Sequence, residues 1–179
     1  MSELPARLID ADAPPTGTVV AYVAVGSNLG DRAAHVAHAF AALDAAPGVR
    51  LVRRSTVHET APVGPPGQGP YLNAVAELAT SLSPRELLAT LLDIERTRGR
   101  DRANEVRFGP RTLDLDLLAW GPAQPGGARI DVPGLTVPHP RMHERPFVLL
   151  PLAEVAPDLA AAAAAGTGVH FEGGSDPRS

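Results

Sequence analysis

The chain has 179 residues, enough for one domain with a buried core and too few for two domains of ordinary size. Its apolar share of 44% is typical of a globular protein, and its net charge of −4 argues against nonspecific binding to DNA or to anionic membranes. The absence of cysteine excludes disulfides, thiolate metal sites and thiol catalysis.

All sixteen basic residues are arginine. A Walker-type phosphate loop needs a lysine, so any phosphate must be held by arginine, histidine, a metal ion or backbone amides. The first residues lack the basic and apolar regions of a signal peptide, and no apolar run is long enough to span a bilayer. We therefore expect a soluble cytoplasmic protein that binds neither nucleic acid nor membranes. We also expect it to be a monomer, with small molecules as its partners.

The first half of the chain predicts a strand, a helix and a second strand. Residues 1–17 are rich in Pro, Ala and Asp and predict a loose N-terminal arm. Residues 18–25 have the pattern of a buried strand, and Asn28 is expected to cap the helix that follows. Pro47 and Gly48 end this helix, and residues 49–59 predict the second strand.

A loop rich in Pro and Gly then leads into a strand with two different faces. Seven of the eleven residues from 60 to 70 are Pro or Gly, so this segment is predicted to be irregular. Residues 71–79 alternate as a strand does. One face is apolar, with Leu72, Ala74, Ala76 and Leu78, and the other carries Tyr71, Asn73, Val75 and Glu77.

The second predicted helix begins with a capping box at Ser83 and Glu86 and ends at Gly99. An irregular loop over residues 99–109 leads to a strand that begins near Leu113. The order βαββαβ predicts an α+β, ferredoxin-like core, an antiparallel sheet with both helices on one face. A C-terminal extension is expected to contain a helical stretch near residues 147–155. The predicted domain spans residues 18–158, followed by a low-complexity tail at 159–179.

Two carboxylates stand two residues apart in the last predicted strand of this core. Alternate side chains of a strand share a face, so Asp114 and Asp116 project together, opposite to the neighbouring leucines. Adjacent carboxylates repel unless a positive charge lies between them, and Mg²⁺ bound to one or two carboxylates and to phosphate oxygens supplies that charge. The alternative is a half-exposed edge strand with acidic outer positions.

Arginines are concentrated just before this carboxylate pair. Arg96 and Arg98 are explained by the end of a helix, where basic side chains complement the dipole. The others lie in or beside the loop at 99–109, where guanidinium groups can bind phosphate oxygens and stabilise phosphoryl transfer: Arg100, Arg102, Arg107 and Arg111.

Further polar and aromatic candidates complete a possible site. If the helices cover one face of the sheet, then Tyr71, Asn73 and the two aspartates share the uncovered face, which suits a flat polar ring beside a metal-bound phosphate. His139 and Arg145 are expected to contact phosphate, and this fits better than zinc binding by His139 with His143. Phe147 is either a core residue or a stacking wall for a planar substrate.

Four segments, in this order and spacing, carry a resemblance to the 6-hydroxymethyl-7,8-dihydropterin pyrophosphokinase family: VAVGSNLGDR (23–32), ETAPVGPPGQGPYLNAVAEL (59–78), GPRTLDLDLL (109–118) and LTVPHPRMHERPFVLLPL (135–152). The resemblance implies the ferredoxin-like fold and a transfer of pyrophosphate from ATP to the hydroxymethyl group of the pterin, in folate biosynthesis.

The resemblance also implies a role for each matching position. Asp114 and Asp116 would hold two Mg²⁺ ions that bridge the phosphates of ATP. Tyr71 and Phe147 would enclose the pterin ring, and its edge would bind Asn73 and the backbone around Thr60 and Val63. The triphosphate would contact Arg111, His139 and Arg145, and the loop arginines Arg100 and Arg102 would stabilise the transferring group together with Arg111.

Two rival interpretations belong to other functional classes. A ferredoxin-like module that binds RNA or a regulatory ligand without catalysis needs aromatic side chains on the sheet and usually a basic surface, but this chain is acidic and contains seven aromatic residues. A metal-dependent phosphohydrolase would leave the residues of the predicted pterin pocket unexplained.

Overall fold

A computed structural model describes residues 6–166 of the chain. Its centre is a five-stranded antiparallel sheet with strand order β2-β4-β1-β5, in which β3 also pairs with β4. The elements are β1 (Val19–Ser27), α1 (Arg32–Ala45), β2 (Val49–Arg54), β3 (His58–Thr60), β4 (Tyr71–Thr80), α2 (Pro84–Thr97), β5 (Asp114–Trp120), β6 (Ile130–Val132), β7 (Leu135–Val137), the 3₁₀ helix η1 (Met142–Glu144), α3 (Pro146–Val155) and α4 (Pro157–Ala164).

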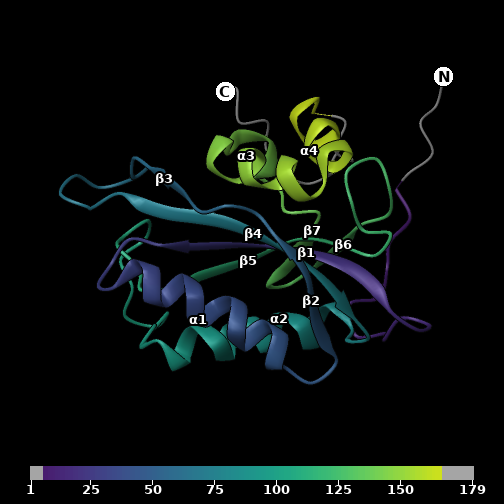
Figure 1. The fold of residues 1–179 in the computed structure, drawn as a ribbon. Helices are drawn as coiled ribbons and strands as arrows, with labels where there is room; N and C mark the ends of the chain where they lie inside the picture. The colour runs from purple at the N-terminus through teal and green to yellow at the C-terminus, as the bar shows by residue number, and fades with distance from the viewer. Residues whose placement is uncertain (1–5, 167–179) are drawn as a thin grey trace.

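Helices α1 and α2 lie together on one face of the sheet (Figure 1). With the order βαββαβ and this strand arrangement, the predicted ferredoxin-like core is confirmed. Apolar side chains run across three neighbouring strands, where Val25 of β1 pairs with Ala74 of β4 and with Leu115 of β5. All three are buried in the core beneath the two helices. The small alanines of β4 leave room for close helix packing.

The start of the first helix differs from the prediction. Asp31, not Asn28, is the N-cap, and its side chain accepts a hydrogen bond from the amide of Ala34 at 3.0 Å. Asn28 instead bonds to residues of two loops, as described below. The second helix begins as predicted, because Ser83 and Glu86 form both hydrogen bonds of a capping box.

The single strand predicted at 49–59 is divided into β2 and β3. At Ser55 the side chain takes part in the pairing, since Ser55 Oγ accepts a hydrogen bond from the Val75 amide at 2.9 Å. The next amide, that of Thr56, donates to the carboxylate of Glu154 in α3 at 2.8 Å. A side-chain partner far along the chain therefore replaces the strand pairing at this point.

The second face of the sheet is not open along its whole length. Helices α3 and α4 cover part of it, opposite to α1 and α2 (Figure 1). Val75 and Leu118 are buried there against Val148 and Leu152 of α3. This packing explains why β4 carries a valine on its otherwise polar face, and it corrects the expectation of a fully uncovered face.

Both ends of the described chain are more ordered than expected. Leu8 pairs with Arg129 next to β6, and Ala11 is buried in the core, so part of the predicted loose arm packs on the domain. In the predicted low-complexity tail, α4 buries Leu159, Ala160 and Ala163. Alanine has the highest helix propensity, and its small side chain allows close packing against α3. The remainder of the predicted tail, residues 167–179, lies outside the described residues.

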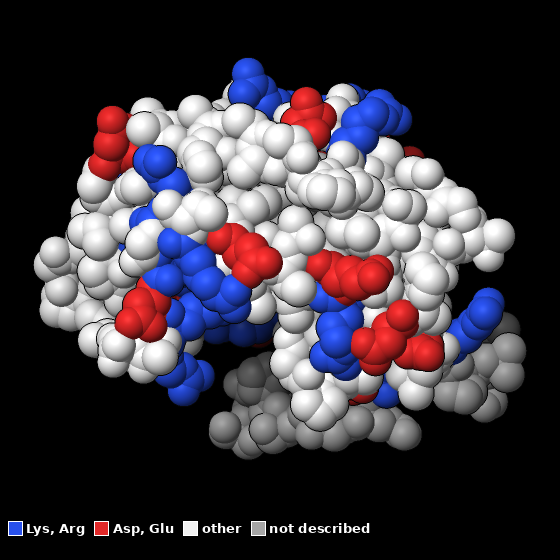
Figure 2. Space-filling model, turned by 90° about the horizontal axis from the view of Figure 1, so that it is seen from below, with Lys and Arg blue, Asp and Glu red and all other residues white. Residues whose placement is uncertain are grey.

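On the surface formed by α1 and α2, acidic side chains border the basic ones (Figure 2). Charges of both signs therefore share this face of the molecule. Within residues 6–166, no helix has the length and apolar character needed to cross a membrane.

Candidate active site

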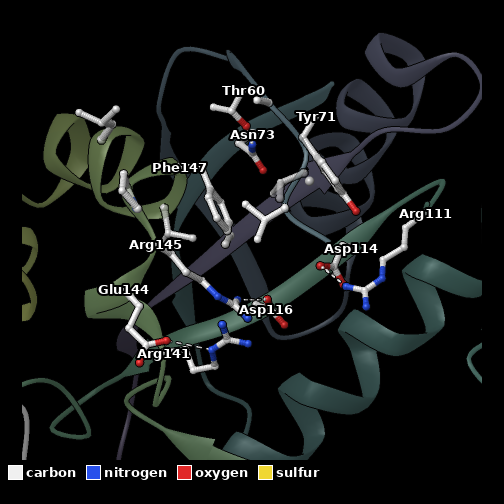
Figure 3. A pocket seen from close by; sticks show the side chains of 18 of the residues that line it. Thr60, Tyr71, Asn73, Arg111, Asp114, Asp116, Arg141, Glu144, Arg145 and Phe147 are labelled. Atoms are coloured by element: carbon white, nitrogen blue, oxygen red, sulfur yellow. Dashed lines mark hydrogen bonds and ion pairs between the residues drawn. The ribbon is translucent and has the colours of Figure 1, made fainter. Parts of the chain in front are cut away.

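A pocket of about 390 Å³ opens on the part of the second sheet face that α3 leaves free. It is lined from β1, β4 and β5, from the loops after β3 and before β5, and from the segment leading into α3 (Figure 3). Nine of the predicted site residues line it: Thr60, Val63, Tyr71, Asn73, Arg111, Asp114, Asp116, Arg145 and Phe147. Arg100, Arg102 and His139 are not among the residues that line it.

The two aspartates lie side by side on the floor of this pocket, as their alternation predicts, but with different partners. Asp114 accepts hydrogen bonds from Arg100 at 2.5 Å and from Arg111 at 3.0 Å. Burial opposes ionisation of Asp114, but the guanidinium groups of Arg111 and Arg100 outweigh it and hold its pKa below the usual value. Burial and the charge of Asp114 raise the pKa of Asp116 to about 6, although Arg145 donates to it at 3.1 Å.

Aromatic side chains stand on opposite sides of the pocket. Tyr71 and Phe147 face each other across it, with Asn73 between them (Figure 3). Asn73 is buried, and its Nδ2 donates to Thr60 Oγ1 at 2.7 Å, which orients the amide. Val63 is exposed at the rim. The arrangement fits a planar ring with hydrogen-bonding groups on one edge.

A glycine that the sequence analysis did not single out makes this floor possible. Gly26 of β1 pairs with Asn73 of β4 and with Asp114 of β5, so it lies between the amide and the carboxylate. A Cβ atom at this position would come within 3.2 Å of Asn73 Oδ1. Any larger residue here would disturb the position of Asn73.

The loop arginines are held beside the pocket by carboxylates. Arg100 is buried and donates to Glu95 at 2.8 Å and to Glu105 at 2.6 Å, in addition to Asp114. Arg102 makes two hydrogen bonds of 2.8 Å to Glu95. Thus Arg100 contacts Asp114 directly, whereas Arg102 is directed toward helix α2.

Glu95 and Glu105 were not recognised as candidates from the sequence. Glu95 had a usable signal, because a charged residue occupies the helical face that also carries Leu91 and Ile94, and all three are buried. Glu105 had none, since it is an ordinary acidic residue of an irregular loop. Phe108 and Arg141 also line the pocket, and the guanidinium of Arg141 lies 5.8 Å from the centre of the Phe108 ring.

Asn28 connects the loops that border the pocket. Its Oδ1 accepts from the amide of Arg111 at 2.8 Å, and its Nδ2 donates to Gln68 at 3.1 Å and to the carbonyl of Gly69 at 3.3 Å. One side chain therefore joins the loop after β3 to the loop before β5. Its sequence position next to a predicted helix start favoured the capping interpretation instead.

His139 lies behind Asp116, with 4.0 Å between Nε2 and the carboxylate. Its Nδ1 accepts a hydrogen bond from the amide of Arg141 at 3.2 Å, which requires the neutral ring with the proton on Nε2. Burial, reinforced by the charge of Arg145, lowers the pKa of His139 to about 4.

This depressed pKa predicts an acid-sensitive contribution to stability. The unfolded histidine binds a proton near pH 6.5, whereas the folded one binds it only near pH 4. The free energy of unfolding is therefore unaffected by His139 above pH 6.5 and decreases as the pH falls from 6.5 toward 4. The expected loss by pH 4.5 is on the order of 2 kcal/mol. Urea unfolding at pH 7 and pH 4.5 measures it, and His139→Asn is expected to lose less than the unchanged protein. An equal loss in both proteins would contradict the buried, neutral state.

The donor set fits a hard divalent cation that shares its coordination with a ligand. Two carboxylates project into the pocket, and carboxylate oxygens are preferred ligands of Mg²⁺. Across residues 6–166, no group of three or more His, Cys, Asp or Glu side chains is placed to hold a metal ion by itself. A cation at Asp114 and Asp116 would therefore complete its coordination with water and phosphate oxygens.

Comparison with known proteins identifies the relatives of this chain. Residues 22–157 match the model of a family described as 7,8-dihydro-6-hydroxymethylpterin-pyrophosphokinase. A 2-amino-4-hydroxy-6-hydroxymethyldihydropteridine pyrophosphokinase from Bacillus subtilis is 46% identical over 136 residues, covering 76% of this chain and 77% of the relative. The enzyme of the same name from Methylorubrum extorquens is 47% identical over 139 residues, covering 78% and 84%. The chain therefore belongs to the 7,8-dihydro-6-hydroxymethylpterin-pyrophosphokinase family.

Proposed function

We propose that the chain transfers pyrophosphate from ATP to 6-hydroxymethyl-7,8-dihydropterin, giving AMP and the pterin diphosphate in folate biosynthesis. Membership of the family supports the reaction. The observation that carries the assignment to this pocket is its division into two halves. Tyr71, Asn73 and Phe147 form a half suited to a planar ring, and the adjoining half holds paired carboxylates and arginines suited to phosphates.

In this proposal the ring lies between Tyr71 and Phe147. Asn73, fixed by its hydrogen bond to Thr60, bonds to the polar edge of the ring, with the backbone near Thr60 and Val63. This orientation points the hydroxymethyl group toward the carboxylates. Specificity follows because a ring without matching donors and acceptors would leave the buried amide unpaired.

The phosphate half consists of charged side chains around the aspartates. Arg111 and Arg145 already lie within hydrogen-bonding distance of Asp114 and Asp116, respectively, and both line the pocket. Together with His139, they would contact the triphosphate. Two Mg²⁺ ions held by Asp114 and Asp116 would supply the positive charge that offsets the phosphates.

The reaction is an in-line attack by the hydroxymethyl oxygen on the β-phosphorus of ATP. The bond from that phosphorus to the oxygen bridging to the α-phosphorus breaks, AMP leaves, and the hydroxyl proton passes to solvent. The side chains act by position and charge: Arg111 and Arg100 would stabilise the transferring group, and Arg102 would join them only after its hydrogen bonds to Glu95 open. Closing loops over the pocket would exclude water, whose attack on ATP competes with transfer.

Replacing Asn73 with alanine is expected to weaken binding of the pterin by about tenfold or more, because a buried hydrogen-bonding group is lost. Binding of a non-hydrolysable ATP analogue should stay unchanged, since Asn73 lies in the ring half of the pocket. Titration calorimetry with each ligand separates the two effects. Thr60→Val, which removes the acceptor that orients Asn73, should have a smaller effect of the same kind. Equal losses for both ligands would contradict the assignment.

The products formed from ATP, Mg²⁺ and 6-hydroxymethyl-7,8-dihydropterin test the proposal directly. AMP and pterin diphosphate in equal amounts, separated by chromatography, are the expected result. ADP would mean transfer of a single phosphate. If the folded protein gives no pterin-dependent turnover, the proposal fails and a ligand-binding module without catalysis becomes the better interpretation.

We also propose that the chain acts on small molecules as a cytoplasmic monomer, without nucleic acid. The net charge of −4 opposes binding to nucleic acid. Light scattering after size-exclusion chromatography measures the oligomeric state.

A further inference from the structure

A buried carboxylate outside the pocket contacts both loop arginines and the strand that carries the aspartates. Glu95 lies in the last turns of α2 and is 1% exposed. Its Oε1 accepts from Arg100 and from Arg102, each at 2.8 Å, and its Oε2 accepts from Arg102 at 2.8 Å. Its position among the apolar residues of the helix would be costly without these partners.

The same carboxylate also holds β5. Oε1 of Glu95 accepts from the amide of Leu115 at 2.7 Å, and Leu115 stands between the two aspartates. Strand β5 is at the end of the sheet order, so this amide is paired by a side chain at the edge of the sheet. One group thereby fixes the strand segment with the carboxylates relative to the arginines.

We propose that Glu95 is a positioning residue for the transfer reaction, acting through Arg100. The guanidinium of Arg100 bonds through one nitrogen to Glu95, to Asp114 and to the carbonyl of Leu113. The inference rests on the proposed function, because Arg100 matters only if charge develops beside Asp114. Glu95 is not among the residues that line the pocket.

Neutralising Glu95 without changing its size tests this role. In Glu95→Gln, Arg100 keeps Asp114 and Glu105 as charged partners and is drawn away from its present position. Such misplacement is expected to lower kcat on the order of 10- to 100-fold, with little change in the KM for ATP. A role limited to stability would instead lower the melting temperature and leave kcat of the folded protein unchanged.

A double-mutant cycle distinguishes the positioning role from a general effect. If Glu95 acts through Arg100, then adding Glu95→Gln to Arg100→Ala should change kcat by less than about twofold, because the two effects are not independent. Asp93→Asn is the matched control: it neutralises an exposed carboxylate of the same helix, paired with Arg96, and should behave as the unchanged protein. If Glu95→Gln does not fold, Glu95→Asp, which keeps the charge on a shorter side chain, replaces it in the cycle.

The outcomes separate this inference from the proposed function. If the unchanged protein forms no AMP from ATP and the pterin, the proposed function fails and the inference fails with it. If it does, the inference alone is overturned by a Glu95→Gln kcat that is unchanged or raised, or by effects that multiply in the double variant. A raised kcat would mean that Glu95 restrains the arginines.

Discussion

Asp116→Asn is expected to reduce kcat on the order of 10²- to 10³-fold while the protein stays folded. The variant keeps the size of the side chain but removes one of the two negative charges on the pocket floor. Since the fold raises the pKa of Asp116 to about 6, keeping this carboxylate ionised at pH 7 lowers the free energy of unfolding. The neutral amide should therefore not lower the melting temperature.

Steady-state kinetics and a thermal unfolding curve on the same preparation measure this pair of effects. The control is Asp131→Asn, which neutralises an exposed carboxylate on β6 and should leave kcat and melting temperature unchanged. Substantial activity in Asp116→Asn would exclude Asp116 as a ligand of an essential cation.

Arg100→Ala is expected to lower kcat by about 10²-fold or more, with little change in the affinity for either substrate. The guanidinium lies against Asp114, where the proposed transfer would change the charge, so its contribution should be larger in the transition state than in the bound ground state. Removing it also takes two hydrogen bonds from Glu105 and one from Glu95, so stability should fall as well.

Kinetics measured well below the melting temperature separate catalysis from unfolding. Arg96→Ala is the matched control, because Arg96 belongs to the same arginine-rich segment but pairs with Asp93 on the exposed face of α2. It should keep full activity. A rise in KM with kcat unchanged would assign Arg100 to substrate binding instead.

The sequence allowed the core of the fold to be predicted because its periodicities are local and unambiguous. The alternation around Asp114 and Asp116 placed both side chains on one face, and the capping box at Ser83 marked the start of α2. Pro and Gly delimited the two loops that border the pocket. These signals depend only on neighbouring residues.

What could not be predicted depends on partners far apart in the sequence. The interruption after β2 follows from Glu154, which is 98 residues away from Thr56. Which part of the second sheet face is covered depends on where α3 packs. In the sequence, only Val75 of β4 indicated that this face is partly buried. Arg100 and Arg102 were predicted to reach the site from a loop. Nothing in the sequence indicated that both would be paired with Glu95 of α2.

If the two substrates bind as proposed, the hydrogen bonds of Asn28 would couple their binding thermodynamically. Its side-chain amide connects the loop after β3 to the loop before β5 by hydrogen bonds. A ligand that restricts the motion of one loop would therefore also reduce the number of conformations available to the other. The second ligand then loses less conformational entropy on binding, and its affinity rises even where no atom changes its average position. By reciprocity, each substrate would then strengthen the binding of the other by the same factor.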